Sequence, residues 1–143
     1  MLLLIIMAFS MQFGMAQNNE LRDFRWKNRL VIIHAGPTGQ PQLKEQLQNI
    51  AQEITAYEER DLKIIILQNN KAWVWSAGEK QALDFQEIVK TLSIDLSVAY
   101  QNFLIGKDGG VKMKQNSAFS NQELFDSIDS MPMRRQEMRN KNK

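Results

Sequence analysis

Residues 30–35 read Leu-Val-Ile-Ile-His-Ala, an apolar and largely β-branched run that stops at Gly36-Pro37. A short run of this kind, bounded by glycine and proline, predicts a buried strand. A second such run, Leu-Lys-Ile-Ile-Ile-Leu, occupies residues 62–67 and predicts a second buried strand. These two runs decide the fold, because the segment that connects them determines whether the two strands are parallel.

The connecting segment has apolar side chains at helical spacing. They recur at steps of four, three, four and three, which predicts an amphipathic helix over about residues 41–59. Pro41 suits the first turn of that helix. A strand, a helix and a strand in succession predict two parallel strands joined by a right-handed crossover. The expected inward residues are Leu43, Leu47, Ile50, Ile54 and Tyr57.

Three further segments extend this pattern. Residues 73–75, Trp-Val-Trp, predict a short extended piece. Residues 79–92 predict a second helix with Leu83 or Phe85 on its inward face. Residues 103–105, Phe-Leu-Ile, predict the start of a third strand.

The remaining elements are marked by turn and cap signals. Asp-Gly at residues 108–109 precedes the extended run 111–114, which predicts a hairpin with a primed turn and positive φ at both central residues. Ser120 and Glu123 have the spacing of a capping box and predict the start of a third helix. Pro132 predicts the end of that helix or the start of a short new one.

The resulting order of elements is β-α-β-α-β-β-α. This order predicts an α/β, thioredoxin-like fold, a three-layer sandwich whose mixed sheet ends in a C-terminal hairpin and helix. The length of 143 residues suits one domain, which we expect over residues 17–143.

The first sixteen residues have the pattern of a secretory signal peptide. Residues 1–16 are uncharged and mostly apolar, and Gly14 and Ala16 are small residues at the −3 and −1 positions of a cut before Gln17. Polar residues follow at once. We therefore expect cleavage between Ala16 and Gln17, no transmembrane segment afterwards, and an extracytoplasmic location, periplasmic or secreted. Retention of the segment as an anchor is the alternative, although it is shorter than a spanning helix of about 20 residues.

The composition excludes several chemistries. The chain has no cysteine, so it has no disulfide, no thiolate metal site and no dithiol for redox exchange. A single histidine cannot build a multi-histidine metal site. We therefore expect no metal and no cofactor.

Four segments resemble a known family. Residues 103–112 read Phe-Leu-Ile-Gly-Lys-Asp-Gly-Gly-Val-Lys, and residues 124–138 contain Leu-Phe, Ile-Asp and Met-Pro-Met-Arg-Arg-Gln-Glu-Met. Together they closely resemble the family catalogued as domain of unknown function 4174. Residues 25–30, Arg-Trp-Lys-Asn-Arg-Leu, and residues 59–62, Glu-Arg-Asp-Leu, resemble it as well.

The resemblance implies a thioredoxin-like fold and an extracytoplasmic location. The family consists mostly of small exported bacterial proteins, and it is similar to a domain of the vertebrate sushi-repeat and coiled-coil-domain-containing matrix proteins. It implies no catalytic residue. Its motif residues are expected to be structural, at a turn and a helix end: Lys107, Asp108, Gly109, Gly110, Asp129 and Pro132.

The loop after the first strand is the first candidate site. A thioredoxin keeps its active site there, but residues 35–38 read Ala-Gly-Pro-Thr, which superficially has the layout of Cys-Gly-Pro-Cys without either sulfur. Residues 99–102 likewise lack the proline that thioredoxins have before the third strand. The loop is expected to be a simple strand-to-helix turn. The alternatives are anion binding around Gly36 at the helix start, or an enzyme centred on His34 and Thr38.

Two tryptophans form the second candidate. Trp73 and Trp75 alternate around Val74, so both rings face one side of an extended segment. Packing against the sheet is the expected role, since aromatic side chains are usually buried. An exposed pair would instead stack on a sugar ring or anchor a partner protein.

The basic C-terminal tail, residues 134–143, is the third candidate. It has five cations against one carboxylate, and it includes the candidate ligand-binding residues Arg134 and Arg135. Such a tail favours an anionic polysaccharide, a lipid surface or an acidic envelope protein, whereas a frayed solubilising terminus is the alternative. Nucleic acid is not expected for an exported protein. The sequence thus predicts a non-catalytic binding or accessory protein of the cell envelope, with the enzyme centred on His34 and Thr38 as the alternative.

Overall fold

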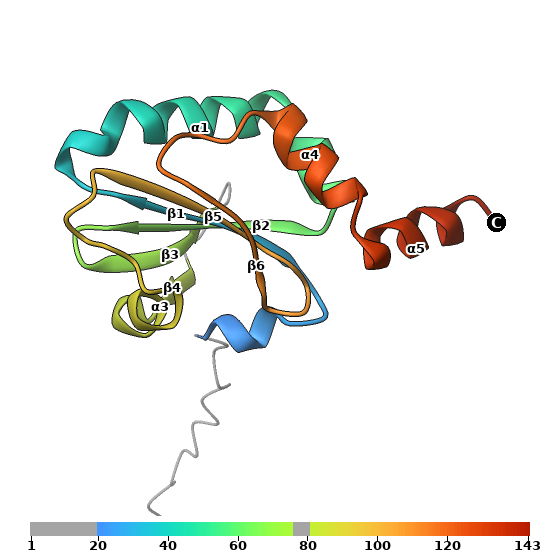
Figure 1. Ribbon diagram of the computed structural model, residues 1–143, viewed down its shortest axis with the longest axis horizontal. Coiled ribbons are helices and arrows are strands. Elements are labelled where there is room, and N and C mark those ends of the chain that lie inside the picture. Colours follow the sequence, from blue (N-terminus) through green and yellow to red (C-terminus); the bar gives the residue numbers. More distant parts are fainter. Residues whose placement is uncertain (1–19, 76–80) are drawn as a thin grey trace, which may run out of the picture.

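The computed structural model describes residues 20–75 and 81–143. The predicted signal peptide and residues 79–80 of the predicted second helix lie outside the described residues. Figure 1 shows a twisted sheet with α1 and α4 on one side and α3 on the other, and with α5 extending away from the sheet at the C-terminal end.

The described residues form one six-stranded sheet in the order β4-β3-β2-β1-β5-β6. Strand β1 lies between β2 and β5, and every residue of β1 is buried. The predicted extended piece around Trp73 is confirmed as β3. The strands are β1 Arg29–Ala35, β2 Leu62–Gln68, β3 Lys71–Trp75, β4 Gln81–Leu83, β5 Tyr100–Ile105 and β6 Val111–Gln115.

The pairing of four strands gives the thioredoxin-like arrangement. Strand β1 is parallel to β2 and antiparallel to β5, and β5 is antiparallel to β6. The helix that follows β1 provides the crossover to β2, and β5 and β6 form the C-terminal hairpin. The predicted fold class is therefore confirmed, with β3 and β4 extending the sheet beyond β2.

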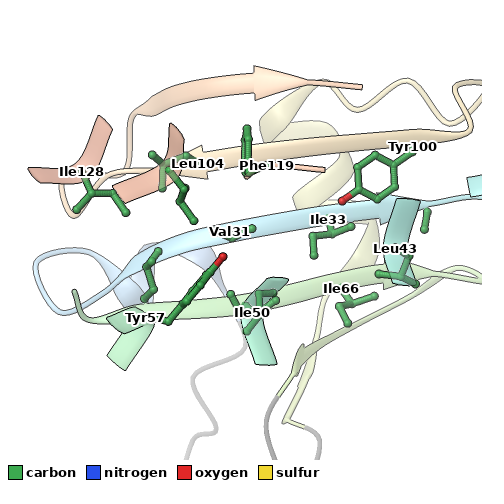
Figure 2. Packing of buried hydrophobic residues seen from close by; sticks show 14 residues of the cluster. Val31, Ile33, Leu43, Ile50, Tyr57, Ile66, Tyr100, Leu104, Phe119 and Ile128 are labelled. Carbon is green, nitrogen blue, oxygen red and sulfur yellow. The ribbon is translucent and has the colours of Figure 1, made fainter. Parts of the chain in front are cut away.

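Helices cover both faces of the sheet and create two cores. Residues of α1, α2 and α4 pack with Val31 and Ile33 on one face, and residues of α3 pack with Leu30 and Ile32 on the other. Figure 2 shows the first core, in which Ile50 and Tyr57 lie beside β1. The helices are α1 Gln40–Gln52, α2 Ile54–Glu59, α3 Phe85–Leu92, α4 Asn121–Asp129 and α5 Pro132–Lys141, with short 3₁₀ turns η1 Leu21–Phe24 and η2 Pro37–Gly39.

Two predicted helices differ from the structure. The helix expected over residues 41–59 is divided at Glu53, whose ψ of 32° is not helical, and Ile54 is consequently 45% exposed rather than inward. In the helix expected over residues 79–92, residues 81–83 form strand β4 instead. The reason is that Asp84 accepts a hydrogen bond from the Glu87 amide and so caps a helix that starts only at Phe85.

The C-terminal signals are largely confirmed. Ser120 and Glu123 form the predicted capping box at the start of α4, and Pro132 begins a new helix, α5. The hairpin between β5 and β6 also exists. Its turn is not the predicted primed type, because Gly109 has a φ of 85° whereas Asp108 is not among the residues with positive φ. The Asp108 carboxylate accepts a hydrogen bond from the Gly110 amide, which stabilises this longer turn.

A buried amide fixes the chain between β6 and α4. The Gln46 Oε1 atom accepts hydrogen bonds from the Asn102 side chain at 2.6 Å and from the Phe119 amide at 2.7 Å. Gln46 and Asn102 are fully buried. The amide of Gln46 therefore joins α1, β5 and the segment that leads into α4.

Candidate functional site

At the carboxyl end of β1, His34 lies on the α3 side of the sheet. Its neighbours Ile33 and Ala35 belong to the opposite core beneath α1, and successive side chains of a strand point to opposite faces. His34 is only 5% exposed, and its Nδ1 atom has no hydrogen-bond partner. Burial lowers the pKa of His34, although the Asp95 carboxylate partly opposes this effect.

The loop that follows β1 packs directly against residue 99. The Gly36 amide donates a hydrogen bond to the Ala99 carbonyl at 2.9 Å, and a Cβ atom added to Gly39 would lie 2.0 Å from the same oxygen. Thr38 is exposed and precedes α1, on the other side of the sheet from His34. The structure therefore does not bring His34 and Thr38 together, and the backbone of residue 99 fills the inner side of the loop.

Trp73 and Trp75 are half-buried in β3, the strand next to the short edge strand β4. Both pack against the core beneath α1, opposite Ile66 and Ile64 of the neighbouring strand. Trp75 also lines a groove of about 440 Å³ between α2 and β2, together with Ile54. Both indole rings thus have a packing role, and one side of Trp75 remains accessible.

The amino end of β1 holds a dense network of charged side chains. At its centre is Arg29, whose side chain is only 1% exposed. Its Nη1 and Nη2 atoms donate hydrogen bonds to the two carboxylate oxygens of Glu137 at 3.1 and 3.2 Å, and Nη1 also donates to the Arg60 carbonyl. Because Glu137 belongs to α5, this pair attaches the C-terminal helix to the first strand.

Lys107 adds a third element to this network. It follows β5, and its ammonium group donates to the Glu137 carboxylate at 2.7 Å and to the Asp61 carboxylate at 2.8 Å. The Lys107 side chain is 9% exposed, so water screens these pairs less than at the surface. The turn after β5, the segment before β2 and helix α5 are therefore joined through one cation.

Asp129 connects the ends of α2 and α4 to α5. Its carboxylate accepts hydrogen bonds from Arg60 at 2.7 and 3.0 Å and from Arg134 at 3.1 Å. Arg134 is 2% exposed and also donates to the Glu59 carbonyl. Arg60 in addition lies over the ring of Phe125, 4.1 Å from its centre.

We call these eight residues the charge network, in which four cations face four carboxylates. Burial opposes ionisation of Asp129 and Glu137, but their cationic partners outweigh it and lower the pKa of both carboxyl groups below the ordinary value. Asp129 and Glu137 are therefore ionised at neutral pH, and the formal charges of the network sum to zero. Its members are Arg29, Glu59, Arg60, Asp61, Lys107, Asp129, Arg134 and Glu137.

The turn between β5 and β6 packs against residues 25–26. The Trp26 amide donates to the Lys107 carbonyl at 2.7 Å, and the Arg25 guanidinium lies so close to Gly109 that a Cβ atom there would be 2.5 Å from Nε. Gly109 is thus required both by its positive φ and by this close approach. The predicted motif residues Lys107 to Gly110 therefore lie in a turn that packs against residues 25–26.

A groove of about 470 Å³ opens beside the charge network. Its walls come from the turn after β5 and from the corner between α4 and α5, with Arg29 contributing from β1. We call it the corner groove. Apolar side chains of the α4–α5 corner face cations across it, and its lining residues include Arg29, Lys107, Asp108, Lys112, Met131, Pro132 and Met133.

Helix α5 presents a different surface to solvent. The predicted tail is mostly helical, since α5 extends to Lys141. Arg134 is buried in the charge network, whereas its neighbour Arg135 is exposed. Arg139 is also exposed, and within residues 20–75 and 81–143 neither Arg135 nor Arg139 forms an ion pair. Lys141 lies 3.9 Å from the Glu59 carboxylate.

The described residues contain neither a cluster of metal-binding side chains nor a membrane-spanning helix. Residues 20–75 and 81–143 contain no group of three or more acidic or histidine side chains placed to hold a metal ion. Over the same part of the chain, no helix is both long enough and apolar enough to cross a bilayer.

The residues of the charge network were only partly found by sequence reasoning. Asp129, Lys107 and Arg134 were singled out, whereas Arg29 and Glu137 were noted only as members of motif segments and were not predicted to pair. The available signal was a charged residue directly beside a buried strand: Arg29 precedes Leu30, and residues 59–61 precede β2. Such flanking charges are usually solvated, so the burial of Arg29 could not be recognised in advance.

The segments that meet in the charge network are the ones that resembled a known family. The sequence profile of domain of unknown function 4174 (DUF4174) matches residues 20–137. The chain belongs to this family. The match ends at Glu137, the carboxylate that binds both Arg29 and Lys107, so the DUF4174 segment includes every member of the charge network. A comparison with curated proteins finds no match.

Among solved structures, the chain is similar to one described as the crystal structure of StoA from Bacillus subtilis. The identity is 13%, the TM-score is 0.48, and the match covers 71% of this chain and 82% of that chain. The fold assignment for this DUF4174 member rests on its own sheet order and strand directions.

Proposed function

We propose that the protein is an exported, non-catalytic binding or accessory domain of the cell envelope that holds an anionic partner against the outward face of α5. The observation behind the proposal is the contrast between the two sides of this helix. On the inner side Arg134 and Glu137 belong to the neutral charge network, whereas on the outer side Arg135 and Arg139 have no carboxylate partner in the described part of the chain.

This arrangement suits long-range attraction. Because Glu137 is occupied by Arg29 and Lys107, it does not neutralise the outward cations. Exposed cations on a projecting helix raise the local concentration of an anionic partner and speed its association, within a screening distance of about 10 Å. Figure 1 shows that α5 extends beyond the sheet, so a broad surface can approach it.

Export is part of the proposal and is supported by the sequence alone. The apolar segment 1–16, with small residues at the −3 and −1 positions of the predicted cut, supports targeting to an extracytoplasmic compartment. The experiment is N-terminal sequencing of protein recovered from the envelope fraction of the native host. A chain that begins with Met1 in the cytoplasmic fraction contradicts export.

The binding proposal is tested by site-specific photo-crosslinking in cells. A photoreactive residue replaces Asn140, which is exposed near the outward cations, or Gln86, which is exposed on α3 and serves as the control position. We expect an anionic species to crosslink at position 140 and not at position 86. Its yield should fall when salt is raised from about 0.05 M to about 0.5 M before irradiation of isolated envelopes.

A matched pair of charge variants completes the test. Arg135→Gln with Arg139→Gln removes two outward cations from α5, and Lys44→Gln with Lys90→Gln removes two exposed cations from α1 and α3. The first variant should lose most of the crosslink and the second should keep it. Equal yields from the two variants contradict a docking role for α5.

The enzyme centred on His34 and Thr38 is supported by one observation, the Nδ1 atom of His34 that lacks a partner. The burial of His34 and the placement of Thr38 across the sheet give less support to this alternative. The experiment is a His34→Ala and Thr38→Ala variant that remains folded. Loss of the protein's biological effect with retained crosslinking at position 140 favours the enzyme.

A further inference from the structure

Arg29, which lines the corner groove, has a buried guanidinium group with unused donors. An arginine side chain has five N–H groups. The hydrogen bonds of Arg29 use three of them, two on Nη1 and one on Nη2. The Nε atom is buried and has no partner. The remaining donors are therefore the Nε–H and the second Nη2–H.

These two donors lie side by side on one edge of the guanidinium plane. Two parallel N–H groups of this kind match the two oxygens of a carboxylate. They can donate one hydrogen bond to each oxygen. Glu137 already occupies the adjacent edge, formed by Nη1 and Nη2. Arg29 thus has the geometry to bind two carboxylates at once, and the structure supplies only one.

We propose that the corner groove is a binding site for a carboxylate attached to a short apolar group, with the carboxylate on the free edge of Arg29. Arg29 lines this groove. Lys107 and Lys112 also line the groove, but each already has a carboxylate partner, so the unused donors of Arg29 are the feature that selects an anion. This site is distinct from the outward face of α5 and does not depend on the proposed function.

The wall of the groove formed by residues 131–133 is apolar and would contact the apolar group of the ligand. Met131, Pro132 and Met133 line the groove, and Met133 is 40% exposed although it is apolar. Methionine side chains adapt their shape to different apolar groups, which is why they are frequent at binding surfaces. A volume of about 470 Å³ lies in the range of small-molecule sites, roughly 300–1,000 Å³.

The decisive experiment compares ligands that differ only in the carboxylate. The protein is produced from its full-length sequence, and amide chemical shifts are followed by NMR during titration with N-acetyl-Ala-Leu, with the same dipeptide as its C-terminal amide, with octanoate and with acetate. We expect saturable shifts at the groove residues Lys107, Asp108 and Met131 with the dipeptide acid or with octanoate, and at least tenfold weaker binding of the amide.

The four ligands also distinguish the sources of the carboxylate. Binding of the dipeptide acid alone identifies a peptide C-terminus, and binding of octanoate alone identifies a fatty acid. Acetate should bind far more weakly than either, because it lacks the apolar group. The proposal would be overturned if the dipeptide acid and its amide bound equally well, or if acetate bound as tightly as octanoate and the dipeptide acid. Chemical-shift changes confined to residues outside the groove would also overturn it.

Two variants at the rim test the groove without touching Arg29. Lys112→Gln removes a cation and releases Asp108, its ion-pair partner, so affinity for the acid should fall about fivefold. Met133→Gln should lower affinity roughly tenfold by removing apolar contact. The matched control is Lys114→Gln on the same strand, which is exposed and does not line the groove. If Lys112→Gln and Lys114→Gln bind equally well, the ligand does not occupy the groove.

Discussion

The two ends of strand β1 differ in how they are closed. At the carboxyl end, where thioredoxins keep their active site, the backbone of Ala99 packs against Gly36 and Gly39, and His34 is buried on the far face. At the amino end, Arg29 is the centre of the charge network and lines an open groove. The comparison teaches that the buried ion pairs of the described residues lie at the end of β1 opposite to the one where thioredoxins keep their active site.

The largest effect is expected from breaking the amino end. Arg134→Met removes donors to the Asp129 carboxylate and to the Glu59 carbonyl, both partly withdrawn from water. Breaking a buried pair costs about 3 kcal/mol, because an uncompensated group remains. The free energy of unfolding, measured by urea titration with circular dichroism, should fall by about that amount.

Its control is the adjacent residue. Arg135 has the same side chain but is exposed and forms no ion pair among the described residues. Arg135→Met should change the free energy of unfolding by less than about 0.5 kcal/mol. Similar losses from the two variants would mean that the network contributes no more than an ordinary surface charge.

A single added methyl group should disrupt the packing at the carboxyl end of β1. A Cβ atom at Gly39 would lie 2.0 Å from the Ala99 carbonyl oxygen, so Gly39→Ala forces the loop and β5 apart. Overpacking of this kind costs about 2 kcal/mol. At Gly36 the same atom would lie 3.5 Å away, an ordinary contact, so Gly36→Ala should be almost neutral in the same urea titration. Equal stability of the two variants contradicts a closed loop.

The carboxyl end of β1 was easier to predict from the sequence than the charge network at its amino end. Buried strands are continuous apolar runs, so residues 30–35 and 62–67 could be recognised locally, and their order predicted the parallel pair that the structure contains. The loop at residues 36–39 was predicted as a plain turn, and the structure shows the contact with Ala99 that makes it one.

The charge network could not be assembled from local patterns. Arg29 and Glu137 are separated by 108 positions, and each resembles an ordinary surface charge when considered alone. The break at Glu53 and strand β4 were missed for a related reason, since hydrophobic spacing alone favoured longer helices there. Tertiary contacts, which a single sequence does not display, decide these positions.

Acid should weaken the charge network in part through protonation of Glu137. Its pKa is lowered by Lys107 and Arg29, despite the opposing effect of burial. A carboxyl group with a lowered pKa adds stability above its ordinary pKa, near 4.5, and this stability is lost as pH falls through the folded-state pKa. Glu137→Gln should therefore be less stable at neutral pH and lose less stability below about pH 4.5 in urea titrations. If Glu137→Gln lost as much stability below pH 4.5 as the unmodified protein, Glu137 would not be ionised in the network.

The smallest effect should come from His34, and it occurs at a different pH. Burial lowers the pKa of His34 from 6.5, with Asp95 partly opposing. Below about pH 6.5 the unfolded chain therefore binds a proton that the folded chain does not, and stability decreases as pH falls until the folded-state pKa is passed. One proton accounts for at most about 1.4 kcal/mol per pH unit. His34→Gln should remove this slope just below pH 6.5, whereas Glu137→Gln should retain it. A slope just below pH 6.5 that survives in His34→Gln would place its origin elsewhere.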